Sequence, residues 1–138
     1  MRRTERGPGS IEWNVAPRWR ATRKGAIALG PGKADLLEAI AASGSISAAA
    51  RALGMSYRRA WVLVATMNAC FVRPLVTTTS RRSAGAALTP DGRAALALYR
   101  RIEARSLSAA RRDIGALLRL LRRPRLTLRA RSPTIPAR

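Results

Sequence analysis

The stretch that decides the fold runs from Ser45 to Ala65 and reads SISAAARALGMSYRRAWVLVA. Its pattern predicts two short helices, residues 46–53 and 57–69, joined by a turn at Gly54. Glycine suits that position because it readily adopts the positive φ that such a tight turn requires. Two short helices in this order predict a helix-turn-helix, whose second helix enters the major groove of DNA.

The side chains of this stretch suit two helices that cross closely. Ala49 and Ala50 are small where the helices touch, and Ser45 and Ser56 are good N-caps. The apolar residues expected to face the core are Ile46, Leu53, Met55, Ala60, Leu63 and Val64. The stretch therefore matches the whole helix-turn-helix pattern and not only a part of it.

The first turn of the second helix is polar and basic, as a DNA-reading edge requires. The expected DNA contacts on this edge are Ser56, Tyr57, Arg58 and Arg59. Arginine pairs with guanine edges or with phosphates, and Ser47 in the preceding helix is placed to meet the DNA backbone. Alternatives stay open here: the arginines are solvated charges, and Trp61 either packs as core or presses on the sugar–phosphate backbone.

A β-hairpin is predicted after the second helix. Residues 75–79 are rich in β-branched side chains, 80–85 read as a loop, and 86–88 form the return strand. Arg81 and Arg82 lie at its tip, so the hairpin is the natural wing, reaching an adjacent minor groove or phosphate. The alternative is an ordinary solvated turn.

Three more elements flank this centre. A short hairpin is expected from residues 19–23 and 26–29, and a helix around residues 36–41 is expected to end at Gly44. Thr89 followed by proline begins a last, long helix to about Leu121, with Gly115 as its weak point.

The composition points to a polyanionic partner. The 138 residues carry 27 Lys and Arg against 7 Asp and Glu, a net charge of +20. A chain this basic typically binds nucleic acid, and an anionic membrane surface is the main rival.

The same inventory argues against other classes. With one cysteine, Cys70, and no histidine, we expect no disulfide and no metal site, and a reducing cytoplasm as the setting. No apolar run is long enough to cross a membrane. The scattered carboxylates form no acid–base pair, so we expect no catalytic residue, no enzyme activity and no cofactor.

Several segments resemble the N-terminal DNA-binding domain of ModE-type molybdate-responsive regulators, which is a LysR-like winged helix. They are GPGKADLLEAI at 30–40, SGSISAAARALGMSYRRAW at 43–61, and shorter matches at 67–68, 74–76 and 88–92 with Tyr99. The resemblance covers residues 19–105 and implies a mainly α fold with a small β wing.

The resemblance also implies a homodimer, formed by the first and last helices, on a pseudo-palindromic operator. The residues expected at the dimer contact are Leu36, Leu37, Ile40, Leu96, Tyr99 and Ile102. Two features depart from the family: the wing TSRRSAG is not glycine-rich, and the chain ends where a molybdate-binding domain would begin. We therefore expect no molybdate site in this chain.

These inferences give four segments. They are a basic arm over 1–18, a winged helix-turn-helix over 19–105, the continuation of a C-terminal dimerisation helix over 106–122, and a basic disordered tail over 123–138. The expected function is a sequence-specific transcriptional regulator on double-stranded DNA, in the cytoplasm at the nucleoid, for genes of molybdate transport or molybdenum enzymes. The alternative is a nucleoid-associated protein with low sequence specificity.

Overall fold

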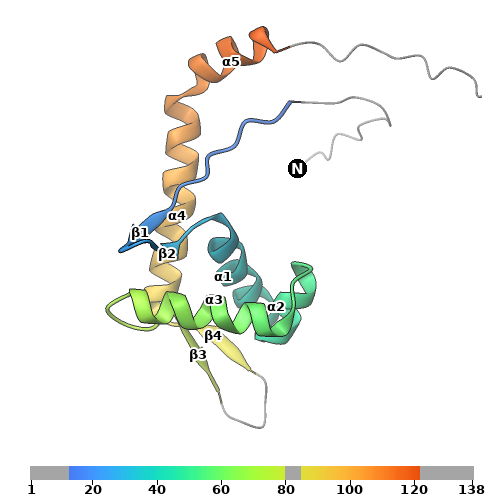
Figure 1. The fold of residues 1–138 in the computed structure, drawn as a ribbon, viewed down its shortest axis with the longest axis vertical. Coiled ribbons are helices and arrows are strands. Elements are labelled where there is room, and N and C mark those ends of the chain that lie inside the picture. The colour runs from blue at the N-terminus through green and yellow to red at the C-terminus, as the bar shows by residue number, and fades with distance from the viewer. Residues whose placement is uncertain (1–12, 80–84, 122–138) are drawn as a thin grey trace, which may run out of the picture. The chain divides into compact units, whose positions relative to one another are not determined.

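The structure, a computed structural model, describes residues 13–79 and 85–121 (Figure 1). They divide into two units: residues 16–109, which hold the helix-turn-helix, and a second unit whose described helix is α5 (Arg111–Leu120). The helices and small hairpins confirm a mainly α fold with a β wing.

The N-terminal hairpin pairs β1 (Ala21–Arg23) with β2 (Ala26–Leu29) in antiparallel register. Both turn residues have positive φ, 49° at Lys24 and 80° at Gly25, which matches the right-handed twist of the two strands. The predicted hairpin is confirmed, although its first strand begins two residues later than expected.

The three central helices begin and end where their local sequence dictates. Helix α1 (Pro31–Ser43) ends at Gly44, whose φ is 71°, and α2 (Ile46–Ala52) is followed by α3 (Tyr57–Cys70) after a turn at Gly54 with φ 66°. Ser45 Oγ accepts from the amide of Ala48 at 2.9 Å, and Ser56 Oγ accepts from the amide of Arg59 at 3.1 Å. The predicted helix-turn-helix and both serine caps are confirmed.

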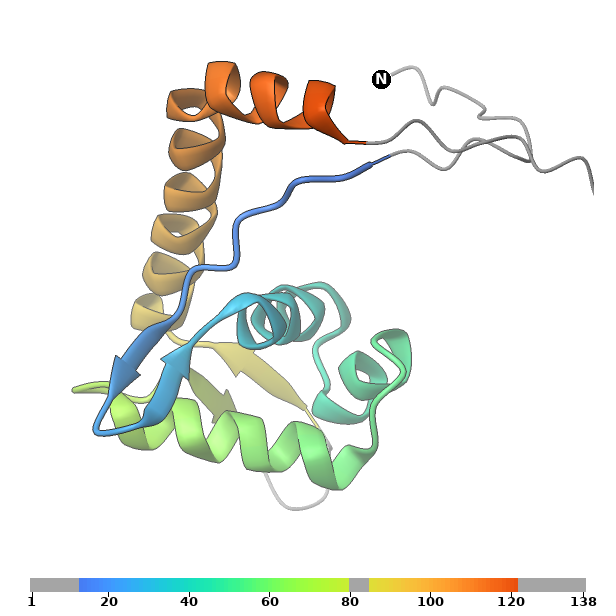
Figure 2. The same ribbon diagram turned by 45° about the horizontal axis from the view of Figure 1, so that its top comes forward.

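The core is formed mainly by side chains of α1, α2, α3 and the wing strands, and Figures 1 and 2 show how these elements are arranged. Its largest fully buried side chains are Leu36, Leu37, Ile40, Met67 and Leu75. One expected core residue is wrong: Leu53 is 38% exposed. It is the C-cap of α2, where the chain turns, so its side chain leaves the helix face that packs on the core.

The wing pairs β3 (Val76–Thr78) with β4 (Ala86–Leu88), as predicted. The side chain of Asn68 joins it to α3: its Oδ1 accepts from the amides of Leu75 (2.9 Å) and Val76 (3.2 Å), and its Nδ2 donates to the Val76 carbonyl (3.1 Å). The base of the wing is therefore fixed to the recognition helix. Arg81 and Arg82 lie outside the described residues.

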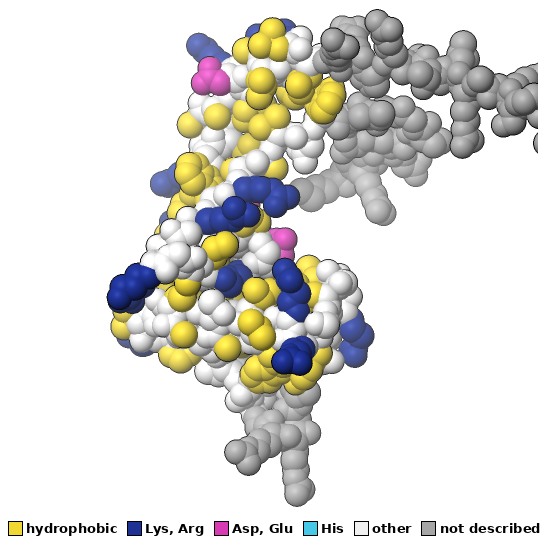
Figure 3. Space-filling model, in the orientation of Figure 1, with side chains coloured by type: hydrophobic (Ala, Val, Ile, Leu, Met, Phe, Trp, Pro, Cys, Tyr) yellow, Lys and Arg dark blue, Asp and Glu magenta, His cyan; other side chains and the backbone are white. Residues whose placement is uncertain are grey.

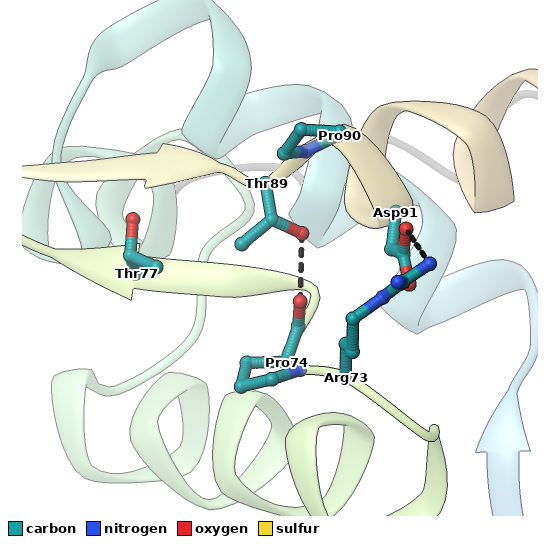
Figure 4. A pocket seen from close by; sticks show the side chains of 6 residues that line it. All are labelled: Arg73, Pro74, Thr77, Thr89, Pro90 and Asp91. Carbon is teal, nitrogen blue, oxygen red and sulfur yellow. Dashed lines mark hydrogen bonds and ion pairs between the residues drawn. The ribbon is translucent and has the colours of Figure 1, made fainter.

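Helix α4 (Pro90–Ala109) starts at the predicted position, and Figure 4 shows how it is joined to the wing. Thr89 Oγ1 donates to the Pro74 carbonyl at 2.6 Å and accepts from the amide of Gly92 at 3.0 Å. A Cβ at Gly92 would lie 2.1 Å from the Leu75 carbonyl oxygen, so only glycine allows this close approach.

The single long helix predicted over residues 91–121 is wrong, because the helix breaks at Ala110 (φ −90°, ψ 4°) and not at Gly115. The Ser106 hydroxyl bonds back to the carbonyl oxygens of Ile102 and Glu103, at 2.8 and 2.9 Å. Such bonds compete with the helical ladder and bend helices, which accounts for an end to α4 shortly afterwards.

The residues predicted at a dimer contact also need correction. Leu36, Leu37 and Ile40 are fully buried within this chain, and Tyr99 is buried with its hydroxyl donating to the Trp19 carbonyl at 2.8 Å. Side chains with no exposed surface cannot touch a second chain. Leu96 is half-buried against the core, and Ile102 alone of the six is well exposed, at 50%.

Candidate nucleic-acid interface

The first turn of α3 forms a polar edge on the surface. Ser56 caps the helix, and Tyr57, Arg58 and Arg59 follow it, all with exposed side chains. The cap is paired with the Arg59 amide, so the position of this turn is fixed by the chain itself. A helix N-terminus that presents such side chains is the geometry that reads base edges in the major groove.

Two aromatic side chains extend this edge by one helical turn. Tyr57, 52% exposed, and Trp61, 38% exposed, meet edge to face with ring centroids 6.0 Å apart. Trp61 is therefore neither fully buried core nor free, because one of its sides packs on Tyr57 while another faces solvent. Exposed rings at this place suit contact with a deoxyribose or a thymine methyl group.

Arg58 and Arg59 lie in different surroundings although they are adjacent in the sequence. Consecutive residues on a helix point roughly 100° apart. Neither arginine has an ion-pair partner among the described residues, but only Arg59 lines a cavity, together with Met55, Arg18 and Lys33.

Ser47 lies in the first turn of α2 and is half-buried. Its hydroxyl accepts a 3.4 Å contact from Arg51 Nη1 on the next turn of the same helix. Ser47, near the start of α2, is therefore close to a basic side chain from the last turn of the same helix, and hydroxyl and guanidinium groups both bind phosphate oxygens.

The charge of the domain is strongly divided between its parts. Between Glu38 and Asp91 the sequence contains no carboxylate, and it contains the arginines Arg51, Arg58, Arg59, Arg73, Arg81 and Arg82. The helix-turn-helix and the wing are therefore purely basic. On the face shown in Figure 3, the described part of this domain accordingly displays much dark blue and little magenta.

The carboxylates of residues 16–109 lie on α1 and α4, and each of them forms an ion pair with an arginine. Arg100 binds Asp35 (2.7 Å), Glu38 (3.0 Å) and Glu103 (2.9 Å), and its own pKa is raised mainly by the hydrogen bond to Asp35. Arg73 binds Asp91, and this hydrogen bond lowers the pKa of Asp91. Within residues 16–109, no acid is left to neutralise the first turn of α3.

Other kinds of site find no support in the described residues. Within 13–79 and 85–121, no group of three or more His, Cys, Asp or Glu side chains is placed to hold a metal ion. None of the helices in these ranges has the length and apolar character needed to cross a bilayer.

The DNA contacts expected from the sequence, Ser47, Ser56, Tyr57, Arg58, Arg59, Trp61, Arg81 and Arg82, stay predictions, and three cations that the fold brings near Arg59 were not among them. They are Arg18, Arg20 and Lys33. Their sequence signal was weak, because it consisted only of two arginines with the i, i+2 spacing of an extended segment. Lys33 gave no such signal, since its buried position depends on packing around the N-terminus of α1.

The class of the domain follows from α1, α2 and α3, the last of which is the capped recognition helix, together with the paired β wing. This is a winged helix-turn-helix DNA-binding domain. Residues 33–93 match the family model of bacterial regulatory helix-turn-helix proteins of the lysR family. The fold also matches CbnR_DBD in the crystal structure of its DNA complex, with a TM-score of 0.51 and 26% identity over 62% of this chain and 95% of that one.

Curated relatives share the same region. The chain is 45% identical over 78 residues to the molybdenum-pterin-binding protein MopB of Rhodobacter capsulatus, covering 55% of this chain and 29% of the relative. It is 40% identical over 84 residues to the molybdenum transport protein ModE of Azotobacter vinelandii, covering 59% of this chain and 31% of the relative. The similarity thus spans less than a third of each relative's length.

Proposed function

We propose that this chain is a transcriptional regulator that binds double-stranded DNA sequence-specifically through α3. The observation that carries the proposal is the first turn of α3, where Tyr57 and Arg58 are exposed at a capped helix N-terminus. The absence of any carboxylate from residues 39–90 means that nothing in this segment repels a phosphate backbone.

In this proposal each side chain of the edge has a distinct role. Arg58 makes a bidentate pair with a guanine edge, and Ser47 and Ser56 fix the helices on flanking phosphates. Tyr57 and Trp61 contact sugar or thymine methyl groups with their exposed ring faces. Arg81 and Arg82, at the wing, contact the adjacent minor groove or its phosphates.

We further propose that the chain acts as a homodimer through α4. Leu98 and Ile102 are large, apolar and exposed on this helix. Together with Trp19 and Phe71 they border a mainly apolar hollow of about 320 Å³. Covering such a surface with a second copy removes apolar area from water. Sedimentation that shows only monomer at micromolar concentration would contradict this part.

The genes regulated are proposed to concern molybdenum. The support is the similarity to relatives whose names refer to molybdenum transport and molybdenum-pterin binding. Binding of the protein to the promoter of a molybdate transporter gene from its own genome, and not to a matched unrelated promoter, is the expected result. Genome-wide binding sites without any molybdenum gene would contradict it.

The second candidate is an architectural protein that binds DNA with little sequence preference. The net charge of +20 favours this candidate, because phosphate contacts alone give tight, salt-sensitive binding. Competition measured by fluorescence anisotropy separates the two functions. A regulator loses a labelled operator only to specific competitor, whereas an architectural protein loses it equally to scrambled DNA.

The sharpest test of the reading edge compares Arg58→Gln with Arg101→Gln. Both remove one exposed arginine, but Arg101 lies on α4. Arg58→Gln should weaken operator binding about 5- to 150-fold, because a bidentate guanine contact is worth about 1–3 kcal/mol, while Arg101→Gln should change it little. Equal effects of both variants would show that α3 does not read the bases.

A further inference from the structure

A cavity of about 330 Å³ lies beside the recognition helix and is lined by four cations. They are Arg18, Arg20, Lys33 and Arg59. The remaining lining residues are Ile27, Gly30, Pro31, Gly32, Met55 and Leu63, so none of the described residues that line the cavity is a carboxylate. Gathering four like charges is unfavourable unless an anion offsets their repulsion.

These cations come from three separate parts of the domain. Arg18 and Arg20 belong to the extended segment before β1, Lys33 to the first turn of α1, and Arg59 to the first turn of α3. Since residues two apart in an extended segment point to the same side, Arg18 and Arg20 reach the cavity together. The convergence is therefore produced by the tertiary fold.

The segment that carries Arg18 and Arg20 is held in place by the residue between them. Trp19 Nε1 donates to Ser106 Oγ at 2.9 Å, and the Trp19 carbonyl accepts from the Tyr99 hydroxyl at 2.8 Å. Both bonds attach the segment to α4. The two arginines are thus presented on an anchored backbone, which lowers the entropic cost of binding a ligand.

Lys33 is the unusual member of the set because it is only 8% exposed. Its Nζ donates to the Ile27 carbonyl, and burial lowers the pKa of its ammonium group. The nearby carboxylates do not compensate this charge: Asp35, two residues on, is bound by Arg100 at 2.7 Å. An anion in the cavity would supply the missing negative charge.

The backbone of α1 adds to the positive field. Its first helical hydrogen bond runs from Ala34 N to Gly30 O (2.8 Å), and its N-cap, Gly30, has no side chain to accept from the amides of Gly32 and Lys33. This contribution to the positive field is smaller than that of the four charged side chains.

We propose that this cavity binds a phosphate group, with Arg18, Arg20 and Arg59 as its hydrogen-bond donors and Lys33 as a buried charge. The phosphate is either one of the DNA backbone, beside the groove that α3 enters, or a free phosphate. The DNA source rests on the proposed function, and it would add the N-terminal segment to the recognition helix and the wing as a third contact. The free source does not depend on DNA binding.

The test uses the full chain, the variant Arg18→Gln/Arg20→Gln and the control Arg101→Gln/Arg105→Gln, which removes two exposed arginines of α4. Inorganic phosphate is titrated into each protein at low chloride, followed by calorimetry and by NMR of the Lys33 ammonium. If the source is free phosphate, the wild type and the control should saturate, with the pKa of Lys33 rising. The cavity variant should bind at least about tenfold more weakly, because two charge-assisted bonds are lost.

A second arm measures DNA affinity against salt for the same three proteins. If the source is a DNA phosphate, the negative slope of log affinity against log salt should become shallower by about 0.9 for the cavity variant. The slope should stay unchanged for the control. Equal behaviour of both variants in both arms would overturn the proposal. If the wild type binds no DNA, the proposed function fails, and the phosphate titration alone decides whether the cavity is a site.

Discussion

The guanidinium of Arg73 binds the carboxylate of Asp91 through two hydrogen bonds, Nε to Oδ2 at 2.8 Å and Nη2 to Oδ1 at 3.0 Å (Figure 4). The pair joins the loop that follows α3 to the first turn of α4. The base of the wing is therefore held by this exposed ion pair and by the part-buried side chain of Asn68.

This pair predicts a pH-dependent stability. Because the hydrogen bond to Arg73 lowers the pKa of Asp91 in the folded protein, the pair stabilises the fold above the unfolded pKa of about 3.9 and loses this effect as the pH falls through the lower folded value. Arg73→Gln should have a lower free energy of unfolding than the wild type at pH 7. This difference should shrink below about pH 4 and be smallest at about pH 2–3. Denaturant unfolding at both pH values measures this. Arg101→Gln is the control, and a difference for Arg73→Gln that is the same at both pH values would contradict the prediction.

Gly92→Ala should be strongly destabilising. The added Cβ would lie 2.1 Å from the Leu75 carbonyl oxygen, so α4 and the wing would have to separate, at a cost of about 3 kcal/mol or more in the free energy of unfolding. Gly32→Ala is the matched control, because a Cβ there has no atom within 4 Å. Urea unfolding compares them, and similar stabilities of the two variants would show that the approach at Gly92 is not rigid.

Asn68 should be required for both stability and DNA binding. Asn68→Ala removes three hydrogen bonds to the backbone of Leu75 and Val76, leaving polar groups unpaired at a total cost of about 2–3 kcal/mol. Since these bonds fix the wing, operator affinity should fall as well, measured under conditions where the variant is folded. Thr66→Ala, which changes another polar residue of α3, is the control. Unchanged stability of Asn68→Ala would be inconsistent with this role.

Arg100 should stabilise the contact between α1 and α4. Its guanidinium lies within 3.0 Å of the carboxylates of Asp35, Glu38 and Glu103. Arg100→Gln should cost about 1–2 kcal/mol, a value kept small by the exposure of Asp35 and Glu38, and the loss should shrink at high salt. Thermal unfolding at low and high salt measures it. A loss that does not depend on salt would indicate packing and not charge.

Local sequence was sufficient for the elements whose ends are set by neighbouring residues. Ser45, Ser56 and Thr89 cap their helices, and Gly44 and Gly54 adopt the positive φ that ends a helix or makes a turn. Each of these features depends on residues within four positions along the chain. The helix-turn-helix, the wing strands and the polar edge of α3 were therefore predictable.

Features that depend on distant residues were not predictable in this way. One miss, by contrast, was local: the end of α4 at Ala109 follows bonds from the Ser106 hydroxyl to the carbonyl oxygens of Ile102 and Glu103, which the apolar stripe does not reveal. The burial of Leu36, Leu37 and Ile40 inside this chain was indistinguishable, by pattern, from burial in a dimer. An apolar stripe on a helix predicts that this face is buried. It does not predict whether the face packs against the same chain or against a second one.

The sequence by itself determined a basic helix-turn-helix with Tyr57 and Arg58 in the first turn of its second helix, because caps, turns and helix faces are local properties. Only the tertiary structure decided that Arg59 shares a cavity with Arg18, Arg20 and Lys33. The physical reason is that residues 41 positions apart, such as Arg18 and Arg59, meet only when the chain packs around its core.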